Sequence, residues 1–371
     1  MKGLYIHIPF CRSKCPYCDF YSCFSKNADI ENYVGSVIDE IKTGRRTKEF
    51  TEDTDLCFDT IYFGGGTPSV IGADNIGKII NRAKEHYTIS DDAEITVECN
   101  PSTVDDEFFE KLVSYGVNRI SLGMQSAVDN ERKKLGRFSD RIQVLSVIES
   151  ARKYGINNIS LDVMLGIPDQ TTKSLDDTIN FCLETGVPHI SAYMLSIEEG
   201  TVFHKRVDSL NLPEEDTVCD MYIHLSERLR NAGFIHYEIS NFAKTGYESR
   251  HNTKYWDCED YLGIGPSAHS FIDGKRFFFV RDISLFTNGE KAVYDTTGGD
   301  REEYIMLRIR LSEGIIFEEF KNRFGIDFPA EIIKKALDFE KQGLMTVSET
   351  GIALTTEGFL ISNYIICELI N

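Results

Sequence analysis

The chain has 371 residues, which is enough for one large domain and a smaller one. Its net charge of −19 at pH 7 argues against nucleic acid as a partner, because an acidic chain repels phosphate backbones. No apolar run reaches the roughly 20 residues that span a bilayer, and the N-terminus lacks the pattern of a secretory signal. We therefore expect a cytoplasmic protein without an integral membrane segment.

The first predicted strand, residues 4–8, leads directly into a loop with the spacing C-x3-C-x2-C, formed by Cys11, Cys15 and Cys18. Three thiolates on one loop can each bind one iron of a four-iron cluster, which leaves the fourth iron open to a small molecule. A disulfide is a weaker alternative, because the chain reads as cytosolic. A structural zinc site is also weaker, because such sites usually have four protein ligands in paired knuckles.

The other cysteines are scattered, which is typical of small buried side chains in a reducing compartment. Cys23 lies five residues after Cys18 and is a weak alternative for a fourth ligand.

Six apolar, β-prone runs alternate with segments of helical period along the first 235 residues. The predicted strands are 4–8, 60–63, 94–99, 119–124, 158–165 and 189–196. The predicted helices are 30–43, 75–87, 105–115, 141–154, 174–184 and 214–231. This alternation predicts an α/β fold with a parallel sheet and outer helices, and ligands at the carboxyl ends of the strands.

Polar or glycine residues stand where the predicted strands end. Gly64, Gly65 and Gly66 follow the second strand, where the missing Cβ atoms allow close approach of a ligand or simply a tight turn. Glu98 ends the third strand, and Asp162 interrupts an apolar fifth strand, where an unpartnered charge is costly. Singly, each residue could have a surface role, but their position at successive strand ends favours a site.

The pattern changes after residue 235. A strand is predicted over 236–243, and residues 246–298 read as loop-rich and aromatic. From about residue 300 a compact module follows, with predicted helices 302–311, 316–324 and 330–342 and a hairpin of 344–347 and 352–354. Helices with a hairpin indicate a winged-helix-like module, and its acidic composition favours packing or a protein partner over DNA.

These motifs resemble the radical S-adenosylmethionine (SAM) superfamily and, within it, the oxygen-independent coproporphyrinogen III oxidase family. The resemblance rests on the cysteine loop, on YIHIPFC, on the GGGTP turn, on the GMQS and LDVMLGIP segments and on the C-terminal module. It implies a partial (β/α)6 barrel over 1–235, a connecting region over 236–299 and a HemN-type C-terminal domain over 300–371.

The resemblance also implies cofactors and the residues that bind them. It implies a [4Fe-4S] cluster on Cys11, Cys15 and Cys18, and SAM, which is chelated by the open iron and cleaved by an electron from the cluster. The implied SAM contacts are Tyr5, Tyr17, Gly65, Gly66, Thr67, Glu98, Gln125, Arg137, Asp162 and Tyr193.

Two departures from the oxidases match the haem chaperone branch of the family. The third cysteine is followed by Asp19 and Phe20, without the further cysteine of the oxidases, and the first strand begins at residue 4, without their long extension. Residues 251–256, His-Asn-Thr-Lys-Tyr-Trp, resemble the HNxxYW motif of that branch. The resemblance implies haem contacts at His251 and Tyr255 and haem-acceptor proteins, such as respiratory enzymes, as partners.

Two alternatives stay open at this point. One is a true enzyme, an anaerobic decarboxylase that converts coproporphyrinogen III to protoporphyrinogen IX. The other is a scaffold that has lost its chemistry, against which the intact Cys11, Cys15 and Cys18 argue.

Overall fold

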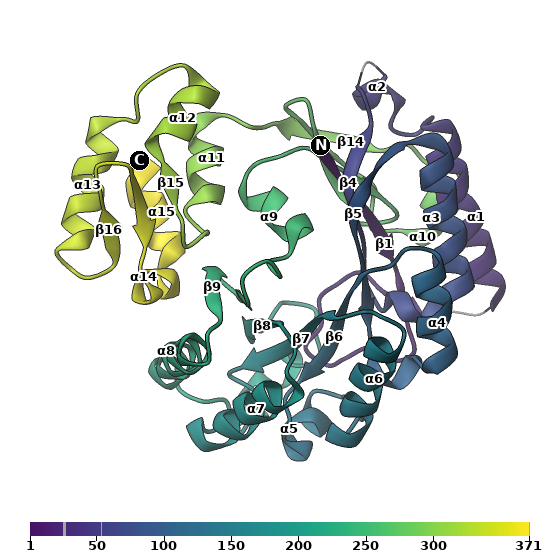
Figure 1. The fold of residues 1–371 in the computed structure, drawn as a ribbon, viewed down its shortest axis with the longest axis horizontal. Coiled ribbons are helices and arrows are strands. Elements are labelled where there is room, and N and C mark those ends of the chain that lie inside the picture. The colour runs from purple at the N-terminus through teal and green to yellow at the C-terminus, as the bar shows by residue number, and fades with distance from the viewer. Residues whose placement is uncertain (25–26, 53, 371) are drawn as a thin grey trace.

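A single large sheet forms the body of the protein (Figure 1). The structure is a computed structural model that describes residues 1–24, 27–52 and 54–370. In this described part, the sheet has twelve strands in the order β14-β13-β12-β11-β1-β4-β5-β6-β7-β8-β10-β9. It curves into an open barrel with helices along its outside (Figure 1).

The centre of the sheet is parallel, as the sequence predicts. Its strands are β1 (Lys2–Ile8), β4 (Cys57–Gly65), β5 (Thr88–Cys99), β6 (Arg119–Gln125), β7 (Asn158–Leu165) and β8 (His189–Met194). All six predicted strands are confirmed, and the fold is that of a partial (β/α)6 barrel. Because the strands are parallel, their carboxyl ends lie at one mouth of the barrel.

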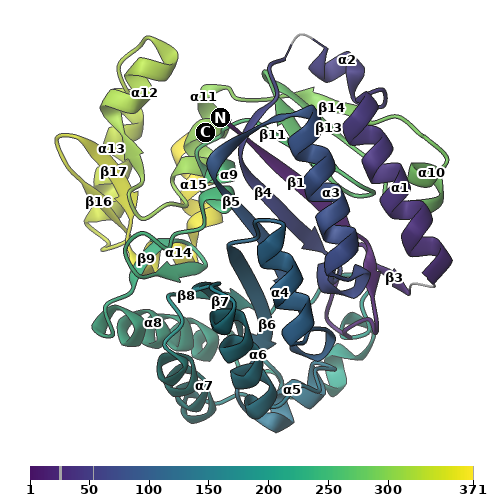
Figure 2. The same ribbon diagram turned by 45° about the vertical axis from the view of Figure 1, so that its right-hand side comes forward.

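Helices cover the outer face of these strands (Figure 2). They are α1 (Asn27–Thr43), α3 (Ala73–His86), α4 (Asp106–Ser114), α6 (Arg141–Lys153), α7 (Thr172–Thr185) and α8 (Glu215–Asn231), with the shorter α2 (Lys48–Thr51) and α5 (Asp129–Lys134). Side-chain caps mark the N-termini of two of these helices. The Asp105 side chain accepts from the Phe108 N–H at the start of α4, and the Asp140 side chain accepts from the Gln143 N–H at the start of α6. The apolar faces of these helices pack on outward residues of the strands, such as Ile61 and Val97, which are buried.

The inner face of the barrel is polar. On β5 the residues Glu94, Thr96 and Glu98 alternate with the buried apolar Ile95 and Val97. Glu98 lines a cavity inside the barrel, so the other two side chains on its face of the strand also point inward. Barrels of this class are often filled by branched aliphatic residues; the polar interior here indicates a lumen suited to ligands or water.

The region after residue 235 is more ordered than the sequence suggests. The expected single strand 236–243 is a hairpin of β9 (Ile235–Glu238) and β10 (Asn241–Ala243). The expected loop-rich segment contains α9 (Arg250–Trp256), β11 (Tyr261–Ile264), β12 (His269–Ile272), β13 (Lys275–Phe278), α10 (Ile283–Thr287) and β14 (Val293–Thr297). These strands extend the sheet at both edges. They were missed because elements of three to five residues are too short to reveal a period.

The domain limits at 235 and 300 stay a prediction. β9 and β10 follow position 235 but pair with β8 in the same sheet.

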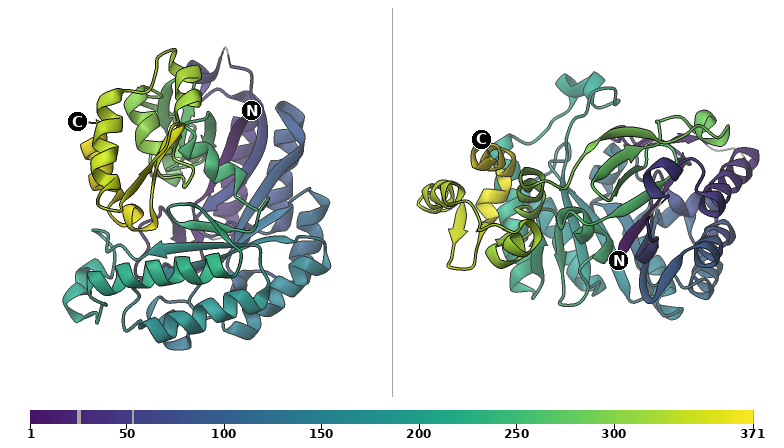
Figure 3. Two further views of the ribbon diagram at one scale, coloured as in Figure 1. Left: turned by 60° about the vertical axis from the view of Figure 1, so that its left-hand side comes forward. Right: turned by 90° about the horizontal axis from the view of Figure 1, so that it is seen from above.

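A separate module closes the chain (Figure 3). It contains α11 (Arg301–Arg308), β15 (Ile315–Ile316), α12 (Phe317–Phe324), α13 (Ala330–Glu340), β16 (Met345–Val347), β17 (Gly351–Leu354), α14 (Thr356–Leu360) and α15 (Ser362–Ile370). The predicted hairpin is confirmed as β16 and β17, which β15 joins on one side; α14 and α15 were not predicted. None of the described helices is long and apolar enough to cross a membrane.

Candidate functional site

A cavity of about 360 Å³ opens at the carboxyl ends of the parallel strands. It contains nine of the ten residues predicted to contact SAM. Its lining is Tyr17, Cys18, Phe20, Gly65, Gly66, Thr67, Glu98, Cys99, Asn100, Ser121, Gly123, Gln125, Arg137, Asp162, Met164 and Tyr193. Most of these residues come from the cysteine loop and from the carboxyl-terminal parts of β4 to β8, as expected for ligand binding at this mouth of the barrel, and Arg137 comes from the segment after α5.

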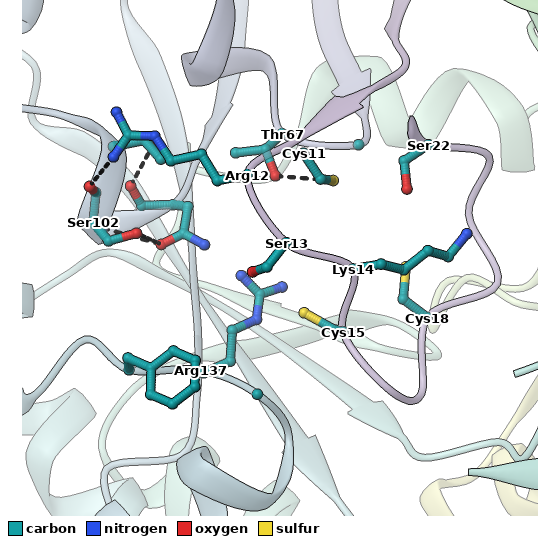
Figure 4. A pocket seen from close by; sticks show the side chains of 15 residues that line it. Cys11, Arg12, Ser13, Lys14, Cys15, Cys18, Ser22, Thr67, Ser102 and Arg137 are labelled. Carbon is teal, nitrogen blue, oxygen red and sulfur yellow. Dashed lines mark hydrogen bonds between the residues drawn. The ribbon is translucent and has the colours of Figure 1, made fainter. Parts of the chain in front are cut away.

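The cysteine loop lies beside this cavity and lines a hollow of its own, which Figure 4 shows. Cys11, Cys15 and Cys18 line one hollow, which shares Thr67 and Arg137 with the larger cavity. All three thiols are free and half-buried. The Sγ of Cys11 lies 3.4 Å from the Oγ1 of Thr67, so the glycine-rich turn contacts the first cysteine directly.

The glycine-rich turn holds the loop in place. The N–H of Gly66 donates to the carbonyl of Ile8, and that of Thr67 donates to the carbonyl of Phe10, both at 2.8 Å. A Cβ on Gly66 would lie 2.8 Å from the Phe10 carbonyl oxygen, and Gly65 has a positive φ of 111° and lies against the His7 ring. Both positions therefore require glycine for the turn to approach the end of β1 and the start of the cysteine loop.

The donor set fits a cluster better than a single ion. Within the described residues, no three His, Cys, Asp or Glu side chains converge closely enough to hold one metal ion. Three cysteines that each bind a different iron need not converge in that way. Burial raises the pKa of the Cys18 thiol, and the nearby Cys15 and Cys11 raise it further. The Cys18 thiolate would therefore be stabilised by positive charge beside it, which the iron ions of a cluster would supply.

Arg137 connects the two hollows. Its side chain lines both, and its Nη2 donates to the hydroxyl of Tyr17 at 3.3 Å. Its Nε is buried without a hydrogen-bond partner in the described part of the chain. A guanidinium with unused donors beside a cavity is suited to a carboxylate ligand.

Two carboxylates face the same cavity. Tyr62 donates to Glu98 at 2.9 Å, and Ser121 donates to Asp162 at 2.9 Å. Burial raises the pKa of Glu98 to about 7, and the charge of Asp162 adds to this rise. Burial likewise raises the pKa of Asp162 to about 6. At neutral pH the pair can therefore accept or donate hydrogen bonds, which suits recognition of hydroxyl and amino groups.

The structure does not bring the other three predicted ligand contacts into this cavity. Tyr5, His251 and Tyr255 lie deeper in the lumen, where the Tyr5 and His251 rings stack with centroids 6.4 Å apart. Both ring nitrogens of His251 are occupied, Nδ1 by the Thr60 hydroxyl at 2.7 Å and Nε2 by the Tyr255 hydroxyl at 2.8 Å.

His251 is 1% exposed. Burial lowers its pKa to about 3, and the cations Lys254 and Arg119 contribute to this shift. The imidazole is therefore neutral, which is the form that binds iron, but it is not free to do so in this conformation.

Sequence reasoning missed Tyr62 and Ser121. Tyr62 bonds Glu98, and Ser121 bonds Asp162 and lines the cavity. The period-two alternation of β4 and β6 could have found them, because each lies on the inward face of its strand.

Comparison with known families gives two matches. The radical SAM superfamily matches residues 5–182, and the HemN C-terminal domain matches residues 300–361.

Curated relatives match almost the whole chain. The protein named Heme chaperone HemW of Lactococcus lactis is 33% identical over 370 residues, which cover 98% of this chain and 95% of that protein. The protein of the same name from Bacillus subtilis is 34% identical, covering 98% of this chain and 97% of that protein. The protein of the same name from Haemophilus influenzae is also 34% identical, covering 97% of this chain and 96% of that protein.

Among solved structures, coproporphyrinogen III oxidase (HemN) from Escherichia coli has the same fold. Its TM-score is 0.82 at 20% identity, covering 100% of this chain and 90% of that chain.

Proposed function

Because the chain belongs to the radical SAM superfamily, and within it to the family of the heme chaperones HemW, we propose that it binds haem and delivers it to haem-requiring proteins such as respiratory enzymes. The observation that carries this proposal is the 33–34% identity to proteins of that name over 97–98% of the chain. We further propose that the chain holds a [4Fe-4S] cluster and SAM.

In this proposal Cys11, Cys15 and Cys18 bind the cluster. They line one hollow next to the larger cavity, and the glycine-rich turn fixes their loop. When bound, the cluster would supply electrons for one-electron chemistry on SAM.

SAM would occupy the cavity at the strand ends. Arg137 offers unpaired donors for its carboxylate, and Glu98 and Asp162 offer acceptors for its hydroxyl and amino groups. The proposed contacts are those nine lining residues, Tyr17, Gly65, Gly66, Thr67, Glu98, Gln125, Arg137, Asp162 and Tyr193, together with Tyr5, which lies deeper in the lumen.

Haem would bind at His251 and Tyr255 only after a local rearrangement. The His251 Nε2 is bonded to the Tyr255 hydroxyl, so coordination of iron through this nitrogen would require that this bond breaks.

The cluster is tested by reconstitution under anaerobic conditions. We expect about 4 iron and 4 sulfide per chain, and loss of both in Cys11→Ala, Cys15→Ala and Cys18→Ala. Cys367→Ala, which removes an exposed thiol of the C-terminal module, is the matched control and should retain the cluster.

Haem binding is tested by a titration followed at the Soret band. We expect haem to shift the Soret band with the wild type, and we expect the His251→Ala change to weaken this shift.

The oxidase alternative is tested by an activity assay. Incubation of coproporphyrinogen III with SAM and a reductant should give no protoporphyrinogen. Substantial product would replace the chaperone assignment by the oxidase.

A further inference from the structure

Three polar side chains on the inner face of the barrel have buried atoms that lack hydrogen-bond partners. They are Thr96 on β5, Arg119 on β6 and Asn158 on β7, here called the lumen row. They are neighbours in register, with Thr96 beside Arg119 and Arg119 beside Asn158. Within the described residues no partner exists for the Thr96 hydroxyl, for Nε and Nη1 of Arg119, or for Oδ1 of Asn158.

Arg119 is the most unusual member of the row. It is 1% exposed and among the largest fully buried side chains. A buried guanidinium without hydrogen bonds costs free energy, because it loses water and gains nothing in exchange. Glu94 acts on it electrostatically, but the two oxygens of Glu94 accept the backbone N–H groups of Arg250 and His251 instead. Arg119 is therefore charge-compensated and yet free to bind an anion.

Two cavities approach the lumen row from opposite ends of the barrel. Ser121, two residues after Arg119 on the same face of β6, lines the upper cavity of about 360 Å³. Asn158 and Glu94 line a lower cavity of about 680 Å³. Thr96 and Arg119 themselves line neither cavity, so the approach to Arg119 would be past Ser121 from above or past Asn158 from below.

The groups of the row match a carboxylate. Arginine binds carboxylates in charge-assisted hydrogen bonds, and the Thr96 hydroxyl can donate a further one. Rotation of the Asn158 amide about its last bond presents an N–H group at the same place.

We propose that the lumen row is a carboxylate-binding site that takes a propionate group of haem, an inference that rests on the proposed function. Arg119 is close enough to His251 for its charge to act on that ring, and Tyr62, beside Thr96 in register, stacks on His251 with centroids 5.1 Å apart. A macrocycle held at His251 would thus lie among aromatic rings with a guanidinium within reach of its edge.

The first experiment uses the wild-type protein and needs no substitution. Haem and haem dimethyl ester, which lacks free carboxylates, are titrated separately and followed at the Soret band. We expect the ester to bind about tenfold to hundredfold more weakly, the loss of a charge-assisted hydrogen bond. Equal affinity for the two would overturn the lumen row as a propionate site.

The second experiment compares Arg119→Met with Arg132→Met. Arg132 is also buried, but it donates to the Ser126 carbonyl and pairs with Asp129, away from the lumen row. We expect Arg119→Met to bind haem as weakly as the wild type binds the ester, with no difference left between haem and ester. Arg132→Met should keep the wild-type preference for haem.

The outcomes separate the two proposals. If the wild type binds neither haem nor ester, the proposed function fails and this inference with it. If haem binds and its preference over the ester survives in Arg119→Met, only the lumen row is wrong. If Arg119→Met does not fold, the comparison of haem with the ester in the wild type decides. Loss of SAM binding in Arg119→Met, with haem binding unchanged, would assign the carboxylate to SAM and also overturn the inference.

Discussion

Glu98 and Asp162 are two buried carboxyl groups at the mouth of the barrel. Both are acidic residues whose pKa burial raises, to about 7 and about 6. The charge on Asp162 disfavours a charge on Glu98. The hydrogen bonds that the hydroxyl groups of Tyr62 and Ser121 donate to these carboxylates offset the free-energy cost of burying them only in part. A ligand with hydroxyl or amino groups would replace this cost with hydrogen bonds.

Glu98→Gln tests this environment through the pH dependence of stability. The pKa of Glu98 rises from 4.5 to about 7 on folding, so its favourable contribution is complete below pH 4.5 and is lost as the pH rises through 7. We expect the variant, relative to the wild type, to gain about 2 kcal/mol in the free energy of unfolding between pH 5 and pH 8. Urea unfolding at the two pH values measures this difference.

Glu110→Gln is the control, because Glu110 is exposed on α4. Its effect on the free energy of unfolding should not depend on pH. A Glu98→Gln effect that is equally independent of pH would contradict the raised pKa.

At the scale of elements, α9 is the part that joins the lumen to the rest of the molecule. It has seven residues and lies in the opening of the barrel (Figure 1). Its first N–H groups, those of Arg250 and His251, donate to the two oxygens of Glu94 at 3.1 Å. Ser249 caps the same end by accepting from the Asn252 N–H. So short a helix depends on such contacts, since few of its hydrogen bonds are internal.

Glu94→Gln should loosen α9. The amide keeps one acceptor oxygen and loses the charge, so one of the two helix N–H groups loses its acceptor and the other keeps only a neutral hydrogen bond, at a cost of about 1–2 kcal/mol. We expect amide hydrogen exchange across residues 250–256 to become about tenfold faster, measured by mass spectrometry of peptides from this segment. Asp91→Asn, an exposed substitution on the same strand, should leave the exchange unchanged. Unaltered exchange in Glu94→Gln would mean that Glu94 does not hold the helix.

At the scale of the whole molecule, the C-terminal module is bonded to the barrel through α9 and β9. Arg308 is 5% exposed and pairs with Asp257 at the end of α9 and with Glu319 of its own module. The N–H of Ser312 donates to the Tyr237 carbonyl of β9 at 3.0 Å. The module therefore stabilises the position of α9, the helix that carries His251. Loss of this contact should increase the mobility of α9.

Arg308→Met tests this stabilisation. It leaves Asp257 and Glu319 without their buried partner, which we expect to cost about 3 kcal/mol. Limited proteolysis should then cut faster near residue 300, and exchange in α9 should rise with it. Arg301→Met removes an exposed arginine of the same helix and should change neither. Faster proteolysis near residue 300 without faster hydrogen exchange in α9 would show that the C-terminal module does not stabilise this helix.

The sequence by itself determined the parallel strands, the cysteine loop and most of the cavity at the strand ends. Strand and helix periods are local, and the carboxyl ends of parallel strands must meet at one mouth. Residues such as Glu98, Arg137 and Asp162 could therefore be grouped before their contacts were known.

Only the tertiary structure decided the rest. It extended the sheet with strands too short to have a period, and it enclosed His251 between the hydroxyls of Thr60 and Tyr255. It also aligned Thr96, Arg119 and Asn158, which no motif connects. The physical reason is that burial and cross-strand register depend on pairing between segments far apart in the chain, which local patterns do not specify.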